Sequence, residues 1–200
     1  MTKGEFMNKY DNRFFQKLIS RGCMPEDIVT EEKINKDTYF ALVGQLPKGV
    51  PMGGASIWVW SNDINKLASF IYQCEIRNNF ALNANLQEND FEQDLTDYIL
   101  YTQNCFDIEQ RERLTKYYDW INRFDKEIKS AISFGNLKNL IDDYNKLNIP
   151  DFDWEMDIRL FANLDEAIEE YNSSVVLTEN KINADMSAKD LAQAFLNAFY

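Results

Sequence analysis

The sequence Asp151-Phe152-Asp153-Trp154-Glu155-Met156-Asp157-Ile158 alternates strictly between acidic and apolar residues. Successive side chains of a β-strand point to opposite faces, so a period of two predicts a strand with one acidic and one apolar face. We expect the acids to share the solvent-facing side of this strand. We expect Trp154 to be buried on the opposite side, so that its truncation to Ala would cost about 3–5 kcal/mol.

An acidic helix is predicted directly after this strand, at Leu164–Tyr171. Its carboxylates recur at i, i+3 and i+4, positions that share a helix face; they are Asp165, Glu166, Glu169 and Glu170. A strand at Ser174–Thr178 and a final helix follow in the prediction. Ser187 and Asp190 have the spacing of a weak capping box at the start of that final helix.

The first half of the chain contains a predicted hairpin. Thr38–Leu46 and Ala55–Trp60 are rich in β-forming residues and are joined by a connection rich in Pro and Gly. Trp58 and Trp60 share one face of the second strand. Aromatic residues at this spacing are more often the buried face of a sheet than a stacking platform for recognition, so we favour burial.

Helices are predicted for most of the remaining chain. Apolar residues at helical spacing mark Phe6–Leu18, Glu26–Ile34, Phe91–Ile99 and a longer stripe from Leu114 to Ile132, and another helix is expected from Asn136 to Asn148. A short strand is possible at Phe80–Leu86. Along the long stripe, acid-first i,i+4 pairs such as Glu109–Arg113 and Asp125–Lys129 predict an exposed face with balanced charge.

These patterns predict an α+β fold that is dominated by helices. We expect a single compact unit with two small β elements, near residues 38–60 and 151–178, and a helical middle. A weak boundary at the turn Asn148–Pro150 would separate a helix-rich α+β region with the hairpin, residues 1–148, from an acidic β-α-β-α subdomain, residues 149–200.

The 200 residues carry a formal charge of −12, which is unevenly placed. Residues 51–100 and 151–200 contribute −5 and −8, while the other two quarters of the chain are close to neutral. Such a charge repels nucleic acid and lipid headgroups and attracts basic protein surfaces. The sequence therefore predicts a basic protein partner, with no direct binding of nucleic acid and no membrane association.

Cysteine usage and the amino terminus indicate the compartment. There are three Cys, without a CxxC motif, and no His, which argues against a disulfide framework and a zinc site and is typical of a reducing cytosol. Residues 1–6 lack the apolar region of a signal peptide. Ala55–Trp60, the longest compact apolar stretch, is too short to span a bilayer. We expect a protein of the host-cell cytosol.

Catalytic and cofactor motifs fit the sequence poorly. An EF-hand that began at Asp151 would have Met156 in place of its Gly and Ala162 in place of its bidentate acid. Glu179-Asn180-Lys181 resembles part of a nuclease site, but a chain this acidic repels its own substrate. The phosphate-binding and dinucleotide motifs are absent, and no Cys lies beside a basic residue. We predict no metal, no cofactor and no catalytic residues, with a hydrolase or nuclease as the minority alternative.

The acids around residues 151–170 are the candidate functional residues. The expected partner-binding set is Asp151, Asp153, Glu155, Asp157, Asp165, Glu166, Glu169 and Glu170, and a secondary acidic surface is expected from Glu88, Asp90, Glu92, Asp94 and Asp97. The alternative interpretation is a solvated sheet edge, which charged residues protect against aggregation. A fold that served stability alone would intersperse Lys among these acids.

The leading hypothesis is that the protein is an inhibitor that mimics DNA. Its acidic surface would occupy the nucleic-acid-binding surface of a basic target. Small size, strong acidity and the lack of an enzyme motif are similar to the features of phage and mobile-element proteins that disable restriction or CRISPR systems, and this similarity is one of class. The alternatives are an immunity or antitoxin-like protein that neutralises a basic toxin, and a small structural or assembly protein.

Overall fold

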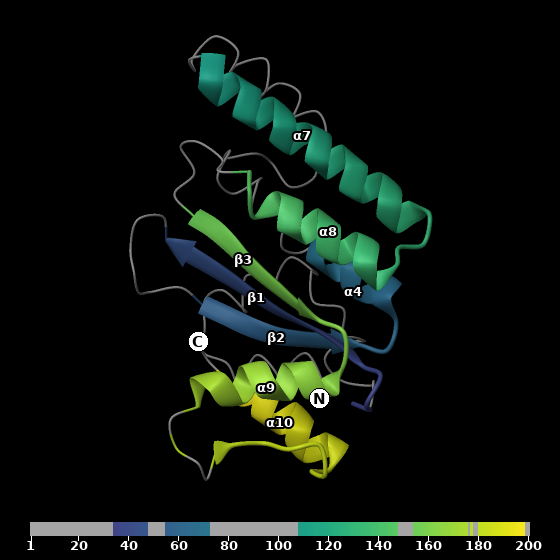
Figure 1. Cartoon of the computed structure of the whole chain (residues 1–200), viewed down its shortest axis with the longest axis vertical. Helices are drawn as coiled ribbons and strands as arrows, with labels where there is room; N and C mark the ends of the chain where they lie inside the picture. Colours follow the sequence, from purple (N-terminus) through teal and green to yellow (C-terminus); the bar gives the residue numbers. More distant parts are fainter. Residues whose placement is uncertain are drawn as a thin grey trace, which may run out of the picture.

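A computed structural model describes residues 34–47, 55–72, 108–147, 154–175, 177 and 180–198. Within these residues the fold is α+β and dominated by helices, with five helices and a single antiparallel sheet of three strands, as predicted (Figure 1). The elements in chain order are β1 (Tyr39–Pro47), β2 (Ala55–Ser61), α4 (Ile64–Phe70), α7 (Ile108–Lys129), α8 (Phe134–Tyr144), β3 (Trp154–Phe161), α9 (Leu164–Ser174) and α10 (Ala188–Asn197).

The sheet has the strand order β2-β1-β3. The predicted hairpin is confirmed, because β1 and β2 pair antiparallel with Phe40 opposite Trp60. The strand predicted from the alternating sequence is confirmed over Trp154–Phe161. It pairs antiparallel with β1, which places Phe161 opposite Phe40, so the two predicted β elements belong to one sheet. The boundary proposed at residues 148–150 lies outside the described residues and stays a prediction.

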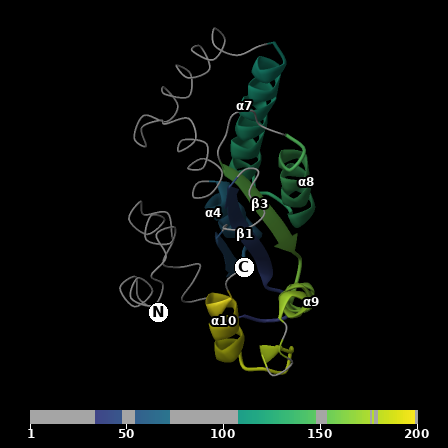
Figure 2. The same cartoon turned by 90° about the vertical axis from the view of Figure 1, so that its left-hand side faces the viewer.

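Helices cover both faces of the sheet. On one face, α4 contacts β1 and β2, α8 contacts β3, and α7 packs outside α4 and α8. On the other face, α9 contacts β1 and β3 while α10 contacts β2 (Figures 1 and 2). The molecule is therefore layered, with α7 at one end and the pair α9 and α10 at the other.

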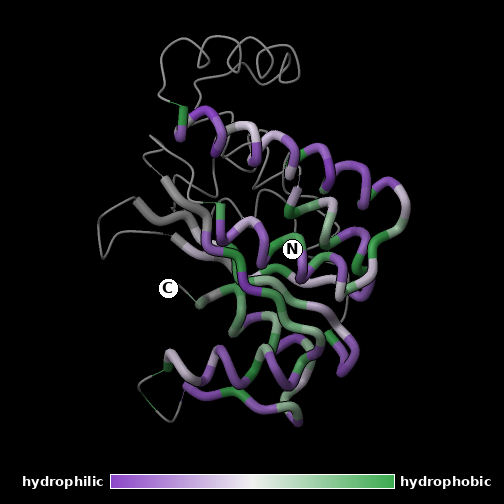
Figure 3. Tube along the Cα trace, turned by 45° about the horizontal axis from the view of Figure 1, so that its top comes forward, coloured by the Kyte–Doolittle hydropathy of each residue, from purple (hydrophilic) through white to green (hydrophobic). Residues whose placement is uncertain are grey.

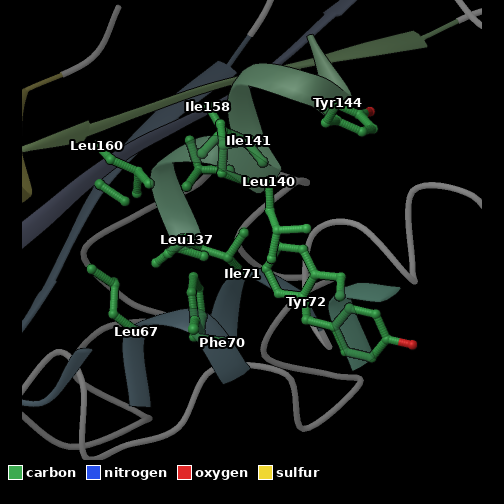
Figure 4. Packing of buried hydrophobic residues seen from close by; sticks show 14 of the residues in the cluster. Leu67, Phe70, Ile71, Tyr72, Leu137, Leu140, Ile141, Tyr144, Ile158 and Leu160 are labelled. Atoms are coloured by element: carbon green, nitrogen blue, oxygen red, sulfur yellow. The ribbon is translucent and has the colours of Figure 1, made fainter. Parts of the chain in front are cut away.

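The core on the α4–α8 face is mainly aliphatic next to the sheet. Ile158 and Leu160 of β3 belong to the same buried cluster as Leu137 and Ile141 of α8, and Figure 4 shows Ile141 beside Ile158. A buried hydrogen bond also connects α7 to α8. The Nε1–H of Trp120 in α7 donates a hydrogen bond to the Leu140 carbonyl at 2.8 Å, which satisfies a donor that burial would otherwise leave unpaired.

The core on the α9–α10 face is strongly aromatic. Trp58 and Trp60 are buried, at 3% and 1% relative exposure, which confirms the prediction that they form a buried face of the sheet. Phe195 of α10 packs between them and Phe40, with ring centroids 4.9 Å from Trp58 and 5.0 Å from Phe40. Burial of these large rings is the main force that holds α10 on the sheet.

The strand predicted at Ser174–Thr178 is wrong at its start, because Ser174 is the last residue of α9 and Val175 is its C-cap. The hydroxyl groups of Ser173 and Ser174 each donate a hydrogen bond of 2.7 Å, to the carbonyls of Glu170 and Tyr171. The second of these bonds satisfies the Tyr171 carbonyl, one of the last four of the helix, which have no intrahelical partner. The helix therefore continues one turn beyond the predicted end at Tyr171.

Several predicted elements lie outside the described residues. They are the helices at Phe6–Leu18 and Phe91–Ile99, the strand at Phe80–Leu86 and nearly all of the helix at Glu26–Ile34. The predicted long stripe is described as α7, followed by α8, which begins after the N-cap Ser133. Figure 3 shows α7 as largely hydrophilic along its length, in keeping with its place in the outermost layer.

Candidate partner-binding surface

Asp157 of β3 lies on the face of the sheet that α9 and α10 cover. Asp157 pairs with Gly44 and Arg159 with Leu42, so both lie on the same face as Phe40 and Trp58. This face changes character along the strands, from aromatic at the Phe40 end to polar at the Gly44 end. The side chain of Asp157 is 45% exposed. Asp157 therefore lies at the margin of a buried surface.

Arg159 links two of the predicted site acids. Its Nε lies 3.5 Å from Asp157 Oδ2 on the same strand, and its Nη1 pairs with the Glu170 carboxylate on α9. All three groups are partly exposed, with relative side-chain exposures of 44% for Arg159 and 26% for Glu170. A single guanidinium thus lies between carboxylates from two elements, an arrangement that the sequence reading did not anticipate.

A third predicted site acid, Glu166, has a structural role at the start of α9. The N-cap is Asn163, whose Oδ1 accepts a hydrogen bond of 3.0 Å from the backbone N–H of Glu166. In return, Glu166 Oε2 accepts a hydrogen bond of 2.9 Å from the backbone N–H of Ala162. This pattern resembles a capping box, except that the Glu side chain accepts from the residue before the N-cap, and the Asn-x-x-Glu spacing in the sequence was its readable signal.

Asp165 and Glu169 are the α9 acids that point into solvent. Both residues are exposed, and within the described part of the chain neither makes an ion pair or a side-chain hydrogen bond. Residues at i and i+4 lie on the same face of a helix, so the two carboxylates are neighbours on its outer side. Asp165 also lies in the first turn, where the helix dipole favours a negative charge.

The charge of the β3–α9 segment contrasts with that of the opposite end of the molecule. Residues 154–175 contain six acids and one base, whereas residues 108–147, which form α7 and α8, contain seven acids and eight bases. On α7, Glu109 pairs with Arg113 and Asp125 with Lys129, as predicted. The same chain therefore balances its surface charge at one end and leaves it unbalanced at the other.

The other predicted site residues are only partly described. Asp151 and Asp153 lie outside the described residues, as does the secondary acidic surface of Glu88, Asp90, Glu92, Asp94 and Asp97. Glu155 is placed by its backbone in β3, opposite Leu46. Among the side chains that the structure describes, no group of three or more Asp, Glu, Cys or His is placed to hold a metal ion. The described helices include none with the length and apolarity that crossing a bilayer requires.

The one resolved pKa shift in the described residues lies away from these acids. Burial raises the pKa of Tyr117 in α7 well above its ordinary value, and the neighbouring Tyr144 and Tyr72 raise it further. A phenol with a raised pKa stays neutral at physiological pH. Tyr117 therefore belongs to the core beneath α7 and adds no charge to the acidic end.

Comparison of the chain with protein-family models, with curated proteins and with solved structures finds no match.

Proposed function

We propose that this protein is an inhibitor that binds a basic, nucleic-acid-binding protein through the acids of α9 and β3. The observation that carries the proposal is the unbalanced charge of residues 154–175, where Asp165 and Glu169 stand exposed on a helix without a single basic residue. A solvated face that served stability alone would resemble α7, with acids and bases paired along the helix. The finer proposal is an anti-CRISPR or anti-restriction type of inhibitor.

The spacing of the acids on α9 supports the proposal that this surface competes with DNA phosphates for the partner. Residues four apart on a helix are separated by about 6 Å along its axis, whereas phosphates on one DNA strand advance about 3.4 Å each. Asp165 and Glu169 alone thus supply roughly half of the charge density of one DNA strand. The strand acids Asp151, Asp153, Glu155 and Asp157 remain part of the proposed surface and would supply the rest.

The test is a pull-down with the immobilised full-length chain and a bacterial lysate. Wild type is expected to retain basic nucleic-acid-binding proteins, which excess double-stranded DNA and salt above about 0.15 M should release because the interaction is electrostatic. The variant Asp165→Lys/Glu169→Lys should lose most of this retention. It spares Glu166 and Glu170, whose carboxylates serve the helix cap and the Arg159 pair.

A matched control separates local charge from net charge. Glu112→Lys/Asp119→Lys changes the formal charge by the same amount at two exposed positions of α7, and it should bind like wild type. Melting curves verify that both variants fold. Equal retention by wild type and Asp165→Lys/Glu169→Lys contradicts the proposal. Retention of a basic toxin that DNA does not release would support the immunity-protein alternative.

A further inference from the structure

β3 is the outer strand on its side of the sheet. In the order β2-β1-β3 it pairs with β1, and within the described residues no other strand pairs with it (Figure 1). An edge strand presents a row of backbone N–H and C=O groups with which another strand can pair. The kind of partner that this edge fits is therefore a second strand.

The charges of β3 select one register for a second copy of the same strand. Asp157 and Arg159 lie two residues apart on one face, with side chains that are 45% and 44% exposed. Ile158 lies between them and is buried on the opposite face. In an antiparallel pair centred on Ile158, Asp157 of each copy lies opposite Arg159 of the other. Opposite charges at directly opposed positions stabilise a strand pair, whereas like charges destabilise it.

Neighbouring registers of the two strands are less favourable. If the centre moves by one residue, either Asp157 or Arg159 lies opposite its own copy, so like charges meet. If the two-fold axis passes between residues, the polar face of one copy lies beside the apolar face of the other. In the register centred on Ile158, Met156 lies opposite Leu160, so that apolar residues also meet. The match thus places the contact along the outer edge of Trp154–Phe161.

We infer that the protein forms a symmetric dimer in which the β3 strands of two copies pair antiparallel about Ile158. Such an interface is isologous, because the same surface of both copies takes part, and it joins two three-stranded sheets into one. The two α9 helices lie on the same face of the joined sheet. The inference goes beyond the proposed function and does not depend on it, because the interface is a strand edge and not the exposed acids of α9.

The first experiment measures the oligomeric state of the full chain by analytical ultracentrifugation. The formal charge of −12 on each copy opposes association. The measurement is therefore made at about 0.15 M salt, where a screening length of about 8 Å limits the repulsion to groups near the interface. Wild type should shift from monomer to dimer as its concentration rises. A chain that stays monomeric up to about 1 mM overturns the inference.

Charge reversal tests the register. In the dimer, Asp157→Arg places bases opposite bases and Arg159→Asp places acids opposite acids, so the dissociation constant of each variant should rise at least about tenfold. The double variant Asp157→Arg/Arg159→Asp restores opposite charges at the wild-type formal charge and should dimerise like wild type. An equimolar mixture of the two single variants should also dimerise, because two bases then face two acids.

Glu112→Arg and Lys116→Asp are the matched controls. They make the same changes in charge at exposed positions of α7, and each should dimerise like wild type. A dimer that the single β3 variants do not weaken, or that neither the double variant nor the mixture restores, uses another surface and overturns the inference.

Hydrogen exchange of the wild type gives a measurement that does not depend on the folding of any variant. Backbone N–H groups of an edge strand point alternately toward its neighbour and away from it. Every second amide of β3 should therefore gain protection from exchange as the concentration rises and the dimer forms. Protection of these amides that stays constant over the same range of concentration overturns the inference.

Discussion

Phe195 packs α10 against the sheet through contacts with four aromatic rings, those of Phe40, Trp58, Trp60 and Tyr171. The side chain is 1% exposed, so its removal would leave a cavity that the surrounding rings cannot fill. We expect Phe195→Ala to lower the free energy of unfolding by about 3–5 kcal/mol. Denaturant unfolding followed by tryptophan fluorescence measures this directly, because Trp58 and Trp60 lie beside the cavity.

Leu177→Ala is the control for Phe195→Ala. Leu177 is a large apolar residue that is 55% exposed, so Leu177→Ala should change the free energy of unfolding by no more than about 0.5 kcal/mol. Similar losses for the two variants would mean that Phe195 is not an anchor of α10.

At the scale of elements, the N-terminal cap of α9 is the feature to test. Asn163 satisfies the N–H of Glu166, and Glu166 satisfies the N–H of Ala162. Asn163→Ala should cost about 0.5–2 kcal/mol, as is usual for loss of an N-cap. Because both bonds serve one helix start, the double variant Asn163→Ala/Glu166→Ala should lose less than the sum of the single losses. Strictly additive losses, measured by chemical denaturation, would show that the two bonds act independently.

The sequence predicted elements better than their assembly. Strict alternation identified β3, and a run of four acids at helical spacing identified α9, because each pattern repeats over a full element. Val175, Val176 and Leu177 are too short a run to separate a strand from a helix end, and α9 extends to Ser174, which was predicted to start the strand. The pairing of β3 with β1 joins segments far apart in the chain and leaves no local signal.

The candidate site was predictable only in part, for a related reason. Charge counts located the acids, but they do not distinguish a free carboxylate from one that a distant base or a backbone N–H has engaged. Arg159 reaches Glu170 because α9 folds back along β3, which no spacing in the sequence states. The spacing of Asn163 and Glu166 indicates a role for Glu166 at the start of α9. Counting Glu166 among the partner-binding acids overlooked this role.

At the scale of the whole molecule, the formal charge of −12 predicts a dependence of stability on salt. Like charges repel in the compact state, and salt reduces this repulsion because the screening length falls from about 30 Å at 0.01 M to about 10 Å at 0.1 M. The melting temperature should therefore rise over this range of sodium chloride. Asp165→Lys/Glu169→Lys, whose formal charge would be −8 instead of −12, should show a smaller rise. A melting temperature that falls or stays constant would contradict this account.

The position of β1 between β2 and β3 has a consequence for how the protein is made. On a ribosome, the hairpin of β1 and β2 emerges long before β3, since Phe40 must wait for Phe161 to arrive more than one hundred residues later. Non-local pairings of this kind form slowly, and an uncovered strand edge is prone to aggregate in the meantime. Trp58 and Trp60 lack the cover that α9 and α10 provide until those helices have been synthesised. The segment that carries the acids of β3 and α9 thus also covers the aromatic face of the sheet, so a nascent chain gains this acidic surface and this part of its core at the same step.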